Sequence, residues 1–371
     1  MTGSTPQLSI VLAGGGTAGH TSPLIATAER LREVEPGVTL TAVGTPKGLE
    51  GRVVPAAGLD LRMIPPVPLP RKLTLALFAV PGRLWGSVRR ARAILDEVDA
   101  DAVVGFGGYV SLPVYLAARL RHSPVVIHEQ NAVPGLANKV AARFAAVTAT
   151  SFPDTPLPGA RYVGLPVKAA ITNLDRAAAR PAARAALGFE GDRPLLLVSG
   201  GSQGAVAINA AVTGARERLL AAGIDVLHVL GPKNLTDAHT AITDAGTGAV
   251  YRPVGYVDAM ETAYAAADLM VGRSGAGTVV ETATVGLPVV FVPLPHGNGE
   301  QARNATFLVE GGAGVLVPNA EFDADRLLAE VLPILTEPAR LTAMADACRG
   351  LVPADAASDL ARIVLDVARR V

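Results

Sequence analysis

The sequence has one cysteine, few aromatic residues, no net charge and no long apolar run. Because Cys348 is alone, an internal disulfide and a cysteine-based zinc cluster are excluded, and we expect a small buried thiol near a helix end. The 33 basic and 33 acidic residues balance, so composition gives no case for a nucleic-acid partner. No apolar run reaches the roughly 18 residues of a membrane span, and no signal peptide is visible. These absences favour a reducing, cytoplasmic compartment.

What is present is a strand–helix alternation over 371 residues, half of them hydrophobic. Such alternation predicts parallel sheets covered on both faces. A strand, a glycine loop and a helix open the chain at Leu8–Ala13, and the same series restarts at Pro194–Ser199. We therefore predict an α/β fold of two doubly wound, Rossmann-like domains, residues 1–164 and 165–353, facing a cleft. The amphipathic helix at 354–371 is a candidate for packing back onto the first domain.

The stretch Gly14–His20, GGGTAGH, follows the first strand and precedes a predicted helix over Leu24–Val34 with Pro23 in its first turn. Glycines let the backbone approach a ligand, and free N–H groups at a helix start attract negative charge. His20 can exchange a proton there near neutral pH. The string also fits a dinucleotide fingerprint, but Glu50 comes too late to hold a ribose. The alternative to a ligand site is a tight turn that binds no ligand.

Other predicted strand ends carry polar loops that suit a two-substrate enzyme. In the loop RSGAGTVVE, Ser274, Gly275 and Gly277 expose N–H groups suited to a phosphate, and Glu281 lies one helical turn further on. Its carboxylate can take both hydroxyls of a ribose, whereas helix capping is the alternative. The remaining loops are GFGGYVS (105–111), HEQN (128–131), GGSQGA (200–205) and PLPHGNGEQARN (293–304), in which Glu300, Gln301 and Asn304 are candidates for reading sugar hydroxyls.

We predict no metal site. The string Asp99-Ala100-Asp101 fits the D-x-D pattern of metal-dependent sugar transferases, but it precedes a strand and lies away from the ligand face. Asp323-Ala324-Asp325 opens a helix and is interpreted as capping. The six histidines have no zinc-ligand spacing.

One segment between Arg62 and Arg92 has no acidic residue and interleaves basic with apolar side chains. A basic rim around exposed apolar groups suits an anionic membrane surface. We therefore expect the Arg71–Arg92 region to contact a membrane. The alternative is that Leu73–Val80 caps the core and the arginines form a solvated face.

Taken together, six motifs in order resemble the MurG family of glycosyltransferases: GGGTAGH, GFGGYVS, HEQN, GGSQGA, RSGAGTVVE and EQARNA (300–305). The resemblance implies the two-domain GT-B fold and metal-independent, inverting transfer of GlcNAc from UDP-GlcNAc to the MurNAc C4 hydroxyl of lipid I. No cofactor is implied. It places the protein at the cytoplasmic face of the cell membrane as a peripheral enzyme.

The resemblance also implies roles for individual residues. His20 lies at the reacting centre with Glu129 as the second candidate base, and the leaving diphosphate is bound by Ser202. The remaining carried-over positions are Thr17, Ala18 and Gly19 at the donor sugar, Asn131 at either sugar, Val257 at uracil, Ala276, Gly277, Thr278, Val279 and Val280 along the nucleotide, Glu281 at the ribose, and Gln301 at the GlcNAc hydroxyls. Two positions depart from the family: Lys168 replaces an arginine and Glu300 a glutamine.

Three rival functions share parts of this pattern. They are another lipid-directed transferase of the same fold, acting on diacylglycerol, a UDP-GlcNAc 2-epimerase, and a nucleotide-binding module without catalysis. The basic–apolar segment argues against the epimerase. The HEQN and GFGGYVS loops argue against a pure binding module, because the donor alone does not require their polar groups.

Overall fold

The chain divides into two compact units. The computed structural model describes residues 7–46, 48–67 and 80–370. Unit 1 comprises Met1–Lys168 with Asp355–Val371, and unit 2 comprises Ala169–Ala354. The first crossing between the units thus follows Lys168 rather than Gly164, and the C-terminal segment belongs to unit 1.

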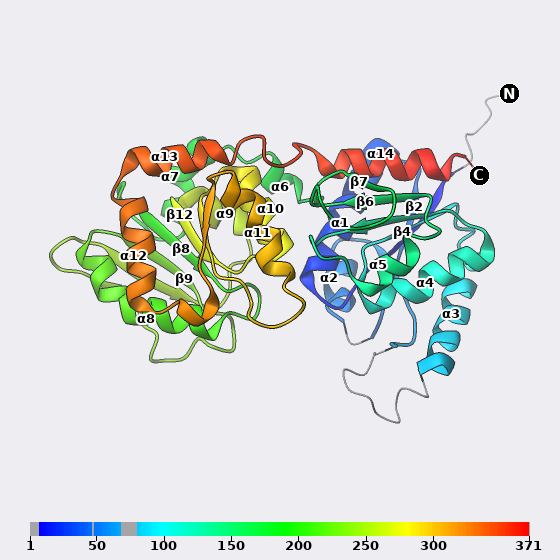
Figure 1. Cartoon of the computed structure of the whole chain (residues 1–371), viewed down its shortest axis with the longest axis horizontal. Coiled ribbons are helices and arrows are strands. Elements are labelled where there is room, and N and C mark those ends of the chain that lie inside the picture. The colour runs from blue at the N-terminus through cyan, green and yellow to red at the C-terminus, as the bar shows by residue number, and fades with distance from the viewer. Residues whose placement is uncertain (1–6, 47, 68–79, 371) are drawn as a thin grey trace. The chain divides into compact units, whose positions relative to one another are not determined.

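Unit 1 is built on a seven-stranded parallel sheet in the order β3-β2-β1-β4-β5-β6-β7. Figure 1 labels four of these strands, β2, β4, β6 and β7, among the surrounding helices. The central strand β1 pairs with β2 on one side and β4 on the other, so the strand order reverses between β1 and β4. Ligands of open parallel sheets bind beyond the strand ends at such a reversal. The strands are β1 (Ser9–Ala13), β2 (Thr39–Gly44), β3 (Asp60–Met63), β4 (Ala102–Gly105), β5 (Val125–Glu129), β6 (Val147–Thr150) and β7 (Ala160–Tyr162).

Helices cover both faces of this sheet, as the near-continuous apolar strands require. Ile10 and Leu12 of β1 belong to the core beneath α1 (Ala18–Val34) and α14 (Ala356–Ala368). Val11 and Ala13 alternate to the other face, beneath α3 (Val80–Glu97) and α4 (Gly108–Arg121). The C-terminal helix α14 therefore completes a layer of unit 1 beside α1. The shorter helices are α2 (Glu50–Ala56) and α5 (Leu136–Ala141).

Two helices of unit 1 begin earlier than their prolines predict. The helix expected from Leu24 begins at Ala18, and the helix that contains Pro113 begins at Gly108. Pro23 and Pro113 are therefore each the sixth helical residue, so the prediction of Pro23 in the first turn is wrong. A proline removes the N–H that would bond to the carbonyl four residues before it. Those carbonyls belong to Gly19 and Tyr109, both exposed, so water can replace the missing donor.

Unit 2 repeats the plan with a seven-stranded sheet in the order β10-β11-β9-β8-β12-β13-β14. Only β10 runs antiparallel among the described strands, and the order reverses between β8 and β12. The strands are β8 (Leu195–Ser199), β9 (Asp225–Val229), β10 (Ile242–Thr243), β11 (Val250–Val254), β12 (Leu269–Gly272), β13 (Val289–Phe291) and β14 (Gly314–Leu316). The predicted restart of the fold is thus confirmed, although β10 and β14 were not predicted.

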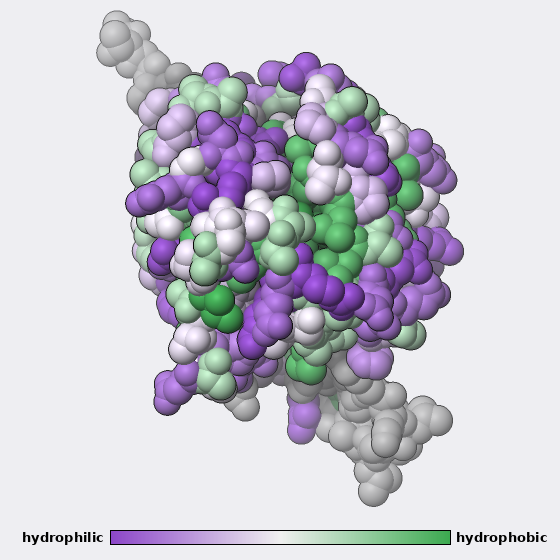
Figure 2. Space-filling view, turned by 90° about the vertical axis from the view of Figure 1, so that its left-hand side faces the viewer, coloured by the Kyte–Doolittle hydropathy of each residue, from purple (hydrophilic) through white to green (hydrophobic). Residues whose placement is uncertain are grey.

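One apolar core of unit 2 lies between the sheet and helices α8 (Val206–Ala221) and α12 (Ala324–Leu335). From the side of these two helices, hydrophilic residues surround a smaller strip of apolar ones (Figure 2). The other helices of unit 2 are α6 (Ala169–Thr172), α7 (Arg176–Ala186), α9 (Met260–Ala266), α10 (Ala276–Val285), α11 (Glu300–Glu310) and α13 (Pro338–Ala347), with a short 3-10 turn at Asn319–Glu321.

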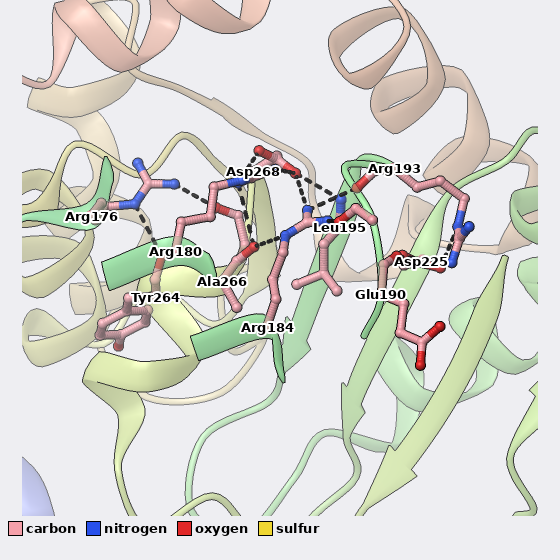
Figure 3. A network of polar contacts seen from close by, with 12 residues as sticks. Arg176, Arg180, Arg184, Glu190, Arg193, Leu195, Asp225, Tyr264, Ala266 and Asp268 are labelled. Atoms are coloured by element: carbon pink, nitrogen blue, oxygen red, sulfur yellow. Dashed lines mark hydrogen bonds and ion pairs between the residues drawn. The ribbon is translucent and has the colours of Figure 1, made fainter. Parts of the chain in front are cut away.

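Three arginines on one face of α7 fasten this helix to the sheet and to α9 (Figure 3). Arg180 bonds both oxygens of Asp268 at 2.6 and 3.0 Å, and Arg184 reaches the same carboxylate at 3.0 Å. Arg176 donates to the carbonyls of Tyr264 and Gly286. Burial lowers the pKa of Arg176 and Arg184, which offsets part of the stabilisation of their charged forms.

The single cysteine lies where it was expected. Cys348 caps the C-terminal end of α13 and is 1% exposed, and burial raises the pKa of its thiol to about 11. The thiol is therefore protonated at neutral pH and is not a nucleophile. Within the described ranges, no helix combines the length and apolar character needed to cross a bilayer.

Candidate functional site

The glycine loop after β1 is held by a buried carboxylate that the sequence did not reveal. Glu50 is fully buried and accepts hydrogen bonds from the N–H of Gly16 at 2.8 Å and of Thr45 at 2.9 Å. A Cβ on Gly15 or Gly48 would lie within 2.5 Å of the Glu50 carboxylate, so these glycines make room for it. Since an internal carboxylate occupies the Gly16 N–H, the loop is not a dinucleotide phosphate cradle, in agreement with the sequence analysis.

The start of α1 presents the predicted residues of this loop. Thr17 is the N-cap residue with extended backbone, and Thr17 and Gly19 are exposed, whereas Ala18 and His20 are half-buried. The Thr17 carbonyl accepts from the N–H groups of His20 and Thr21 at 3.2 Å. His20 therefore belongs to the first turn of a helix, next to the loop.

The loop after β4 packs against His20. Gly107 and Gly108 both have positive φ, at 76° and 77°, which favours glycine. A Cβ on Gly108 would lie 2.9 Å from the Gly15 carbonyl and 3.3 Å from Cδ2 of His20. The GFGG turn thus brings its backbone against the imidazole edge, and Tyr109 beside it is 39% exposed.

The HEQN loop after β5 supplies the partner of His20. The Gln130 Oε1 lies 2.9 Å from Nδ1 of His20, and the Gln130 amide nitrogen bonds the His128 ring and carbonyl. Gln130 and His128 are both buried. Neither was predicted as a site residue, because only the folded topology brings β5 beside the start of α1. Asn131 is half-buried in the same loop.

Glu129, the second candidate base, forms its hydrogen bonds within its own loop. It is 2% exposed, its Oε1 accepts from the N–H of Asn131, and its Oε2 accepts from the N–H of Gly135 and the amide of Asn138, each at 2.9 Å. Three donors of the same loop thus engage both carboxylate oxygens. Its position favours a role in shaping the HEQN loop over a role in proton transfer.

In unit 2, the loops after β8 and β12 lie on either side of the strand reversal. Gly201 and Gly204 have positive φ, and a Cβ on Gly204 would lie 1.9 Å from the Leu230 carbonyl. Ser202 and its neighbour Gln203 are exposed on this loop just before α8. The GGSQGA segment is thus a tight turn with its hydroxyl and amide side chains at the surface, as a diphosphate site requires.

The loop after β12 places a helix start beside a buried hydroxyl. Helix α10 begins at Ala276 with Gly275 as N-cap residue, and the fully buried Ser274 Oγ has no hydrogen-bond partner among the described residues. Gly277 and Thr278 are half-buried in the first turn, whereas Ala276 is 6% exposed. Free N–H groups of such a first turn are suited to an anion.

Two of the residues predicted to line the nucleotide are buried. Val279 and Val280 are at most 2% exposed, so their side chains belong to the protein interior. The Val279 N–H donates to the Gly275 carbonyl within the helix and is not available to a ligand. The helix period turns these two positions inward once the helix begins at Ala276. Of the five positions 276–280, only Gly277 and Thr278 are thus half-buried rather than buried.

Glu281 is held by a buried tyrosine. The Tyr264 hydroxyl donates to Oε2 of Glu281 at 2.8 Å, and Oε1 lies 3.7 Å from where a Cβ of Gly277 would be. The carboxylate thus points back over the helix start, the usual lean of helical side chains. Burial first, and then Glu281, raise the pKa of Tyr264, so its hydroxyl stays protonated and donates. Glu281 is in the second turn, so the capping alternative is wrong.

The three residues near the start of α11 that were predicted to contact sugar hydroxyls differ in burial and in hydrogen bonding. Gln301 is half-buried and accepts from the Leu294 N–H at 2.9 Å, which holds it at the loop edge. Asn304 is fully buried and donates to the Ser274 carbonyl at 3.3 Å. Asn304 therefore joins α11 to the loop after β12, and its full burial argues against the prediction that it reads a sugar hydroxyl. Glu300 lies in the first turn and accepts from the Asn298 N–H at 3.2 Å.

The remaining predicted positions lie apart in the chain. Val257 is half-buried, three residues after the end of β11, and Lys168 is exposed at the last position of unit 1. The acidic pair near β4 has structural roles: Asp101 accepts from the Ser9 N–H at 2.7 Å and Asp99 pairs with Arg121 at 2.7 Å. Across residues 7–46, 48–67 and 80–370, His, Cys, Asp and Glu nowhere gather in threes suited to a metal ion.

Comparison with known proteins identifies the family of this chain. The model of the glycosyltransferase family 28 N-terminal domain matches residues 10–150, and that of the C-terminal domain matches residues 195–360. A protein of Cutibacterium acnes is 63% identical over 368 residues, which cover 98% of each chain. It is named UDP-N-acetylglucosamine–N-acetylmuramyl-(pentapeptide) pyrophosphoryl-undecaprenol N-acetylglucosamine transferase. A protein of Nocardioides with the same name is 54% identical over 97% of this chain and 98% of its own.

Solved structures agree with the sequence relatives. The crystal structure of Acinetobacter baumannii MurG superposes with a TM-score of 0.78 at 30% identity, covering 97% of this chain and all of that one. The calicheamicin glycosyltransferase CalG4 has a TM-score of 0.71 at 17% identity over 99% of this chain, a likeness of fold alone. Because both family domains match and a relative is 63% identical over nearly the whole length, this chain belongs to glycosyltransferase family 28.

Proposed function

We propose that the protein transfers GlcNAc from UDP-GlcNAc to the C4 hydroxyl of MurNAc in undecaprenyl-pyrophosphoryl-MurNAc-pentapeptide, giving UDP and the lipid-linked disaccharide. The observation that carries the proposal is the name of the Cutibacterium acnes relative, together with 63% identity over 98% of both chains. The six motif loops support it, since each follows a strand or opens a helix on the two sheets.

We infer that unit 2 binds the donor. Glu281, oriented by Tyr264, takes the ribose hydroxyls, and the half-buried Val257 holds uracil through its backbone. The first turn of α10, Ala276–Thr278, and Ser202 bind the diphosphate. Gln301, held at the loop edge by Leu294, reads the GlcNAc hydroxyls. Thr17, Ala18, Gly19 and Asn131 of unit 1 contact the sugars.

His20 is our proposed general base. It removes the proton from the MurNAc O4, which attacks C1 of GlcNAc, while the bond from C1 to the β-phosphate oxygen of UDP breaks and UDP leaves with its electron pair. The anomeric configuration inverts. Glu129 is the less suitable base, because three donors of its own loop already engage its oxygens.

The departing diphosphate needs positive charge. We propose that the helix starts of α8 and α10 supply it in place of a metal ion, since their free N–H groups carry partial positive charge. Lys168 adds a point charge, without the bidentate geometry of an arginine.

We further propose that the protein docks peripherally on the cytoplasmic face of the membrane through the Arg71–Arg92 region. Residues 68–79 of this region lie outside the described part of the structure. On α3, Trp85 is 58% exposed and lines one hollow with Arg89, Arg92 and Leu120, which is itself 46% exposed. Within the described residues, Arg83 and Arg89 form no ion pair, whereas Arg90 pairs with Glu97 at 2.9 Å. Unpaired arginines beside an exposed tryptophan suit an anionic lipid surface.

Vesicle sedimentation tests this docking. The protein should bind vesicles rich in phosphatidylglycerol more tightly than phosphatidylcholine vesicles, and salt should weaken that binding. The substitution Arg83→Glu with Arg89→Glu should reduce binding at least tenfold, whereas Arg349→Glu, an exposed arginine of unit 2, should not. Equal binding by the α3 variant would exclude α3 from the contact.

An acceptor panel tests the reaction. Labelled UDP-GlcNAc should be transferred to a lipid I analogue and not to diacylglycerol, which should also receive nothing from UDP-glucose. Transfer only to diacylglycerol would establish the lipid-directed alternative. Formation of the 2-epimer of the donor without an acceptor would establish the epimerase. No turnover with any acceptor, but tight UDP-GlcNAc binding, would leave a binding module.

A further inference from the structure

A chain of four hydrogen-bonded groups runs from His20 into the core of unit 1. His20 Nδ1 lies 2.9 Å from Gln130 Oε1, and Gln130 Nε2 lies 3.0 Å from His128 Nδ1 and 2.7 Å from the His128 carbonyl oxygen. His128 Nε2 then lies 2.8 Å from the Gly164 carbonyl oxygen. Gln130 is 1% exposed and His128 fully buried, so water does not compete for these bonds.

The buried end of the chain fixes the proton on His128. A carbonyl oxygen only accepts, so Nε2 of His128 carries the proton that it donates to Gly164. Burial lowers the pKa of His128 to about 4, and its imidazole is therefore neutral at physiological pH. A neutral imidazole has one proton, so Nδ1 of His128 is an acceptor.

The two hydrogen-bond acceptors of His128, its Nδ1 and its carbonyl oxygen, determine the orientation of the Gln130 side-chain amide. Its NH₂ group faces the His128 Nδ1 and carbonyl oxygen, and donates to both. The reversed amide would set an oxygen 2.7 Å from a carbonyl oxygen and 3.0 Å from an imidazole lone pair, two repulsive contacts in a buried place. The Gln130 oxygen must therefore face His20.

The orientation of the Gln130 amide determines which atom donates in the bond between Gln130 and His20. Since Gln130 Oε1 only accepts, the proton of this bond belongs to His20 Nδ1. In neutral His20 the other ring nitrogen, Nε2, then carries a lone pair. This edge of the ring faces the glycine turn: a Cβ on Gly108 would lie 3.6 Å from Nε2. No protein group of the described residues bonds to Nε2.

We propose that Gln130 and His128 are positioning residues that hold His20 in the Nδ1–H tautomer, so that its Nε2 can receive the proton of the acceptor hydroxyl. This inference rests on the proposed function for its purpose, but the tautomer itself does not depend on any reaction. Its sequence signal is the pair His128 and Gln130, which are two residues apart at the end of β5, a spacing that places both side chains on one face.

Three variants separate positioning from mere stability. Gln130→Met removes both polar ends at similar volume. Gln130→Glu keeps an oxygen that accepts from His20, and its second oxygen must carry a proton to donate to His128 in place of the amide. Asn209→Leu is the matched control, because Asn209 in unit 2 is another buried amide bonded to a buried histidine, His228, at 3.2 Å. It loses comparable bonds far along the chain from His20.

Proton–nitrogen correlation spectra of protein with ¹⁵N-labelled histidine rings report the tautomer, and His20→Gln assigns the His20 signal. We expect Nδ1–H at His20 in the unsubstituted chain, in Gln130→Glu and in Asn209→Leu, and loss of the single tautomer in Gln130→Met. A proton on Nε2 in the unsubstituted protein would overturn the proposal, as would an unchanged tautomer in Gln130→Met. If Gln130→Met does not fold, the unsubstituted spectrum alone decides.

Kinetics give the second readout. In GlcNAc transfer to a lipid I analogue, Gln130→Met should lower kcat about 10- to 100-fold, with the KM for UDP-GlcNAc within about twofold. A change confined to KM would contradict a positioning role. If the unsubstituted chain shows the Nδ1–H tautomer but no transfer to any acceptor, the tautomer assignment stands and the proposed function fails.

Discussion

At the scale of single residues, each of two proposed reactive or binding groups is oriented by a buried partner. His20 is oriented by Gln130 and Glu281 by Tyr264, at 2.9 and 2.8 Å. The partners are shielded from water, so each bond fixes a side chain more firmly than an exposed bond would. Replacing a reactive group and replacing its partner should therefore affect different kinetic constants.

The substitution His20→Ala should lower kcat of GlcNAc transfer about 10²- to 10⁴-fold, the usual contribution of a general base, with little change in donor affinity. Steady-state kinetics with a lipid I analogue measure kcat, and calorimetric titration with UDP-GlcNAc measures the donor affinity. Full activity in this variant would remove His20 as the base.

The substitution Tyr264→Phe should raise the KM for UDP-GlcNAc about 5- to 20-fold and leave kcat nearly unchanged. It removes the hydrogen bond that orients Glu281, and such a bond to a charged group contributes roughly 1.5–3 kcal/mol before exposure reduces it. Tyr162→Phe, a tyrosine of unit 1 that is 38% exposed, is the control. A Tyr264→Phe variant with unchanged KM would separate Glu281 from ribose binding.

The sequence indicated His20, Glu281 and Gln301 as candidates, because each follows a glycine loop or opens a helix after a strand, and their roles stay predictions. It did not reveal Glu50, Gln130 or Tyr264. Their roles depend on which strands become neighbours, and the sequence does not specify that order. Conversely, Val279, Val280 and Asn304 share the motif strings, but the helix period turns them inward.

At the scale of elements, buried charge fixes the position of α7 on unit 2. Asp268 accepts from Arg180, Arg184 and the Leu195 N–H, and so joins α7 to the start of β8. Arg176 of the same helix donates to the Tyr264 carbonyl, the residue that orients Glu281. The structural network and the donor site therefore meet on α9.

The substitution Asp268→Asn should lower the free energy of unfolding by about 3 kcal/mol, because it leaves the buried Arg184 without its countercharge. Asp325→Asn breaks the exposed Arg218–Asp325 pair and should cost less than about 0.5 kcal/mol. Urea unfolding of both variants makes the comparison. Equal losses would show that the α7 network does not carry this stability.

Helix starts were the least predictable feature of the elements. Both Pro23 and Pro113 suggested a start nearby, yet the helices begin five residues before them. Propensity rules place proline in the first turn, whereas here the missing donors fall at Gly19 and Tyr109, two exposed residues. This difference brings His20 into the first turn of α1.

At the scale of the whole molecule, two units of the same plan each enclose one buried neutral histidine on a strand. Burial lowers the pKa of both His128 and His228 to about 4. In the unfolded chain their pKa is near 6.5, so between pH 6.5 and 4 the unfolded state binds more protons. Their contribution to stability is full above pH 6.5 and is lost as the pH falls.

The free energy of unfolding should therefore decrease by about 2 kcal/mol for each histidine from pH 7 to pH 5, and by on the order of 3 kcal/mol once the pH is below 4. Urea unfolding at both pH values measures this. The substitution His228→Phe should remove part of the decrease. Equal stability of the unsubstituted protein at pH 7 and pH 5 would contradict the neutral, buried state of both rings.

The fold class was predictable at this scale because the strand–loop–helix series occurs twice. The edge strands β7, β10 and β14 were not, since they have two or three residues and too short an apolar pattern. The division of the chain after Lys168 and the return of α14 to unit 1 depend on long-range packing, which local patterns do not encode.

The most direct test of the central claim is the structure and amount of the product formed from UDP-GlcNAc and a lipid I analogue. Mass spectrometry and NMR should find one β-linked GlcNAc on the MurNAc C4 oxygen for each UDP released. An α-linked product, a different attachment site, or UDP release without disaccharide would contradict inverting transfer to lipid I.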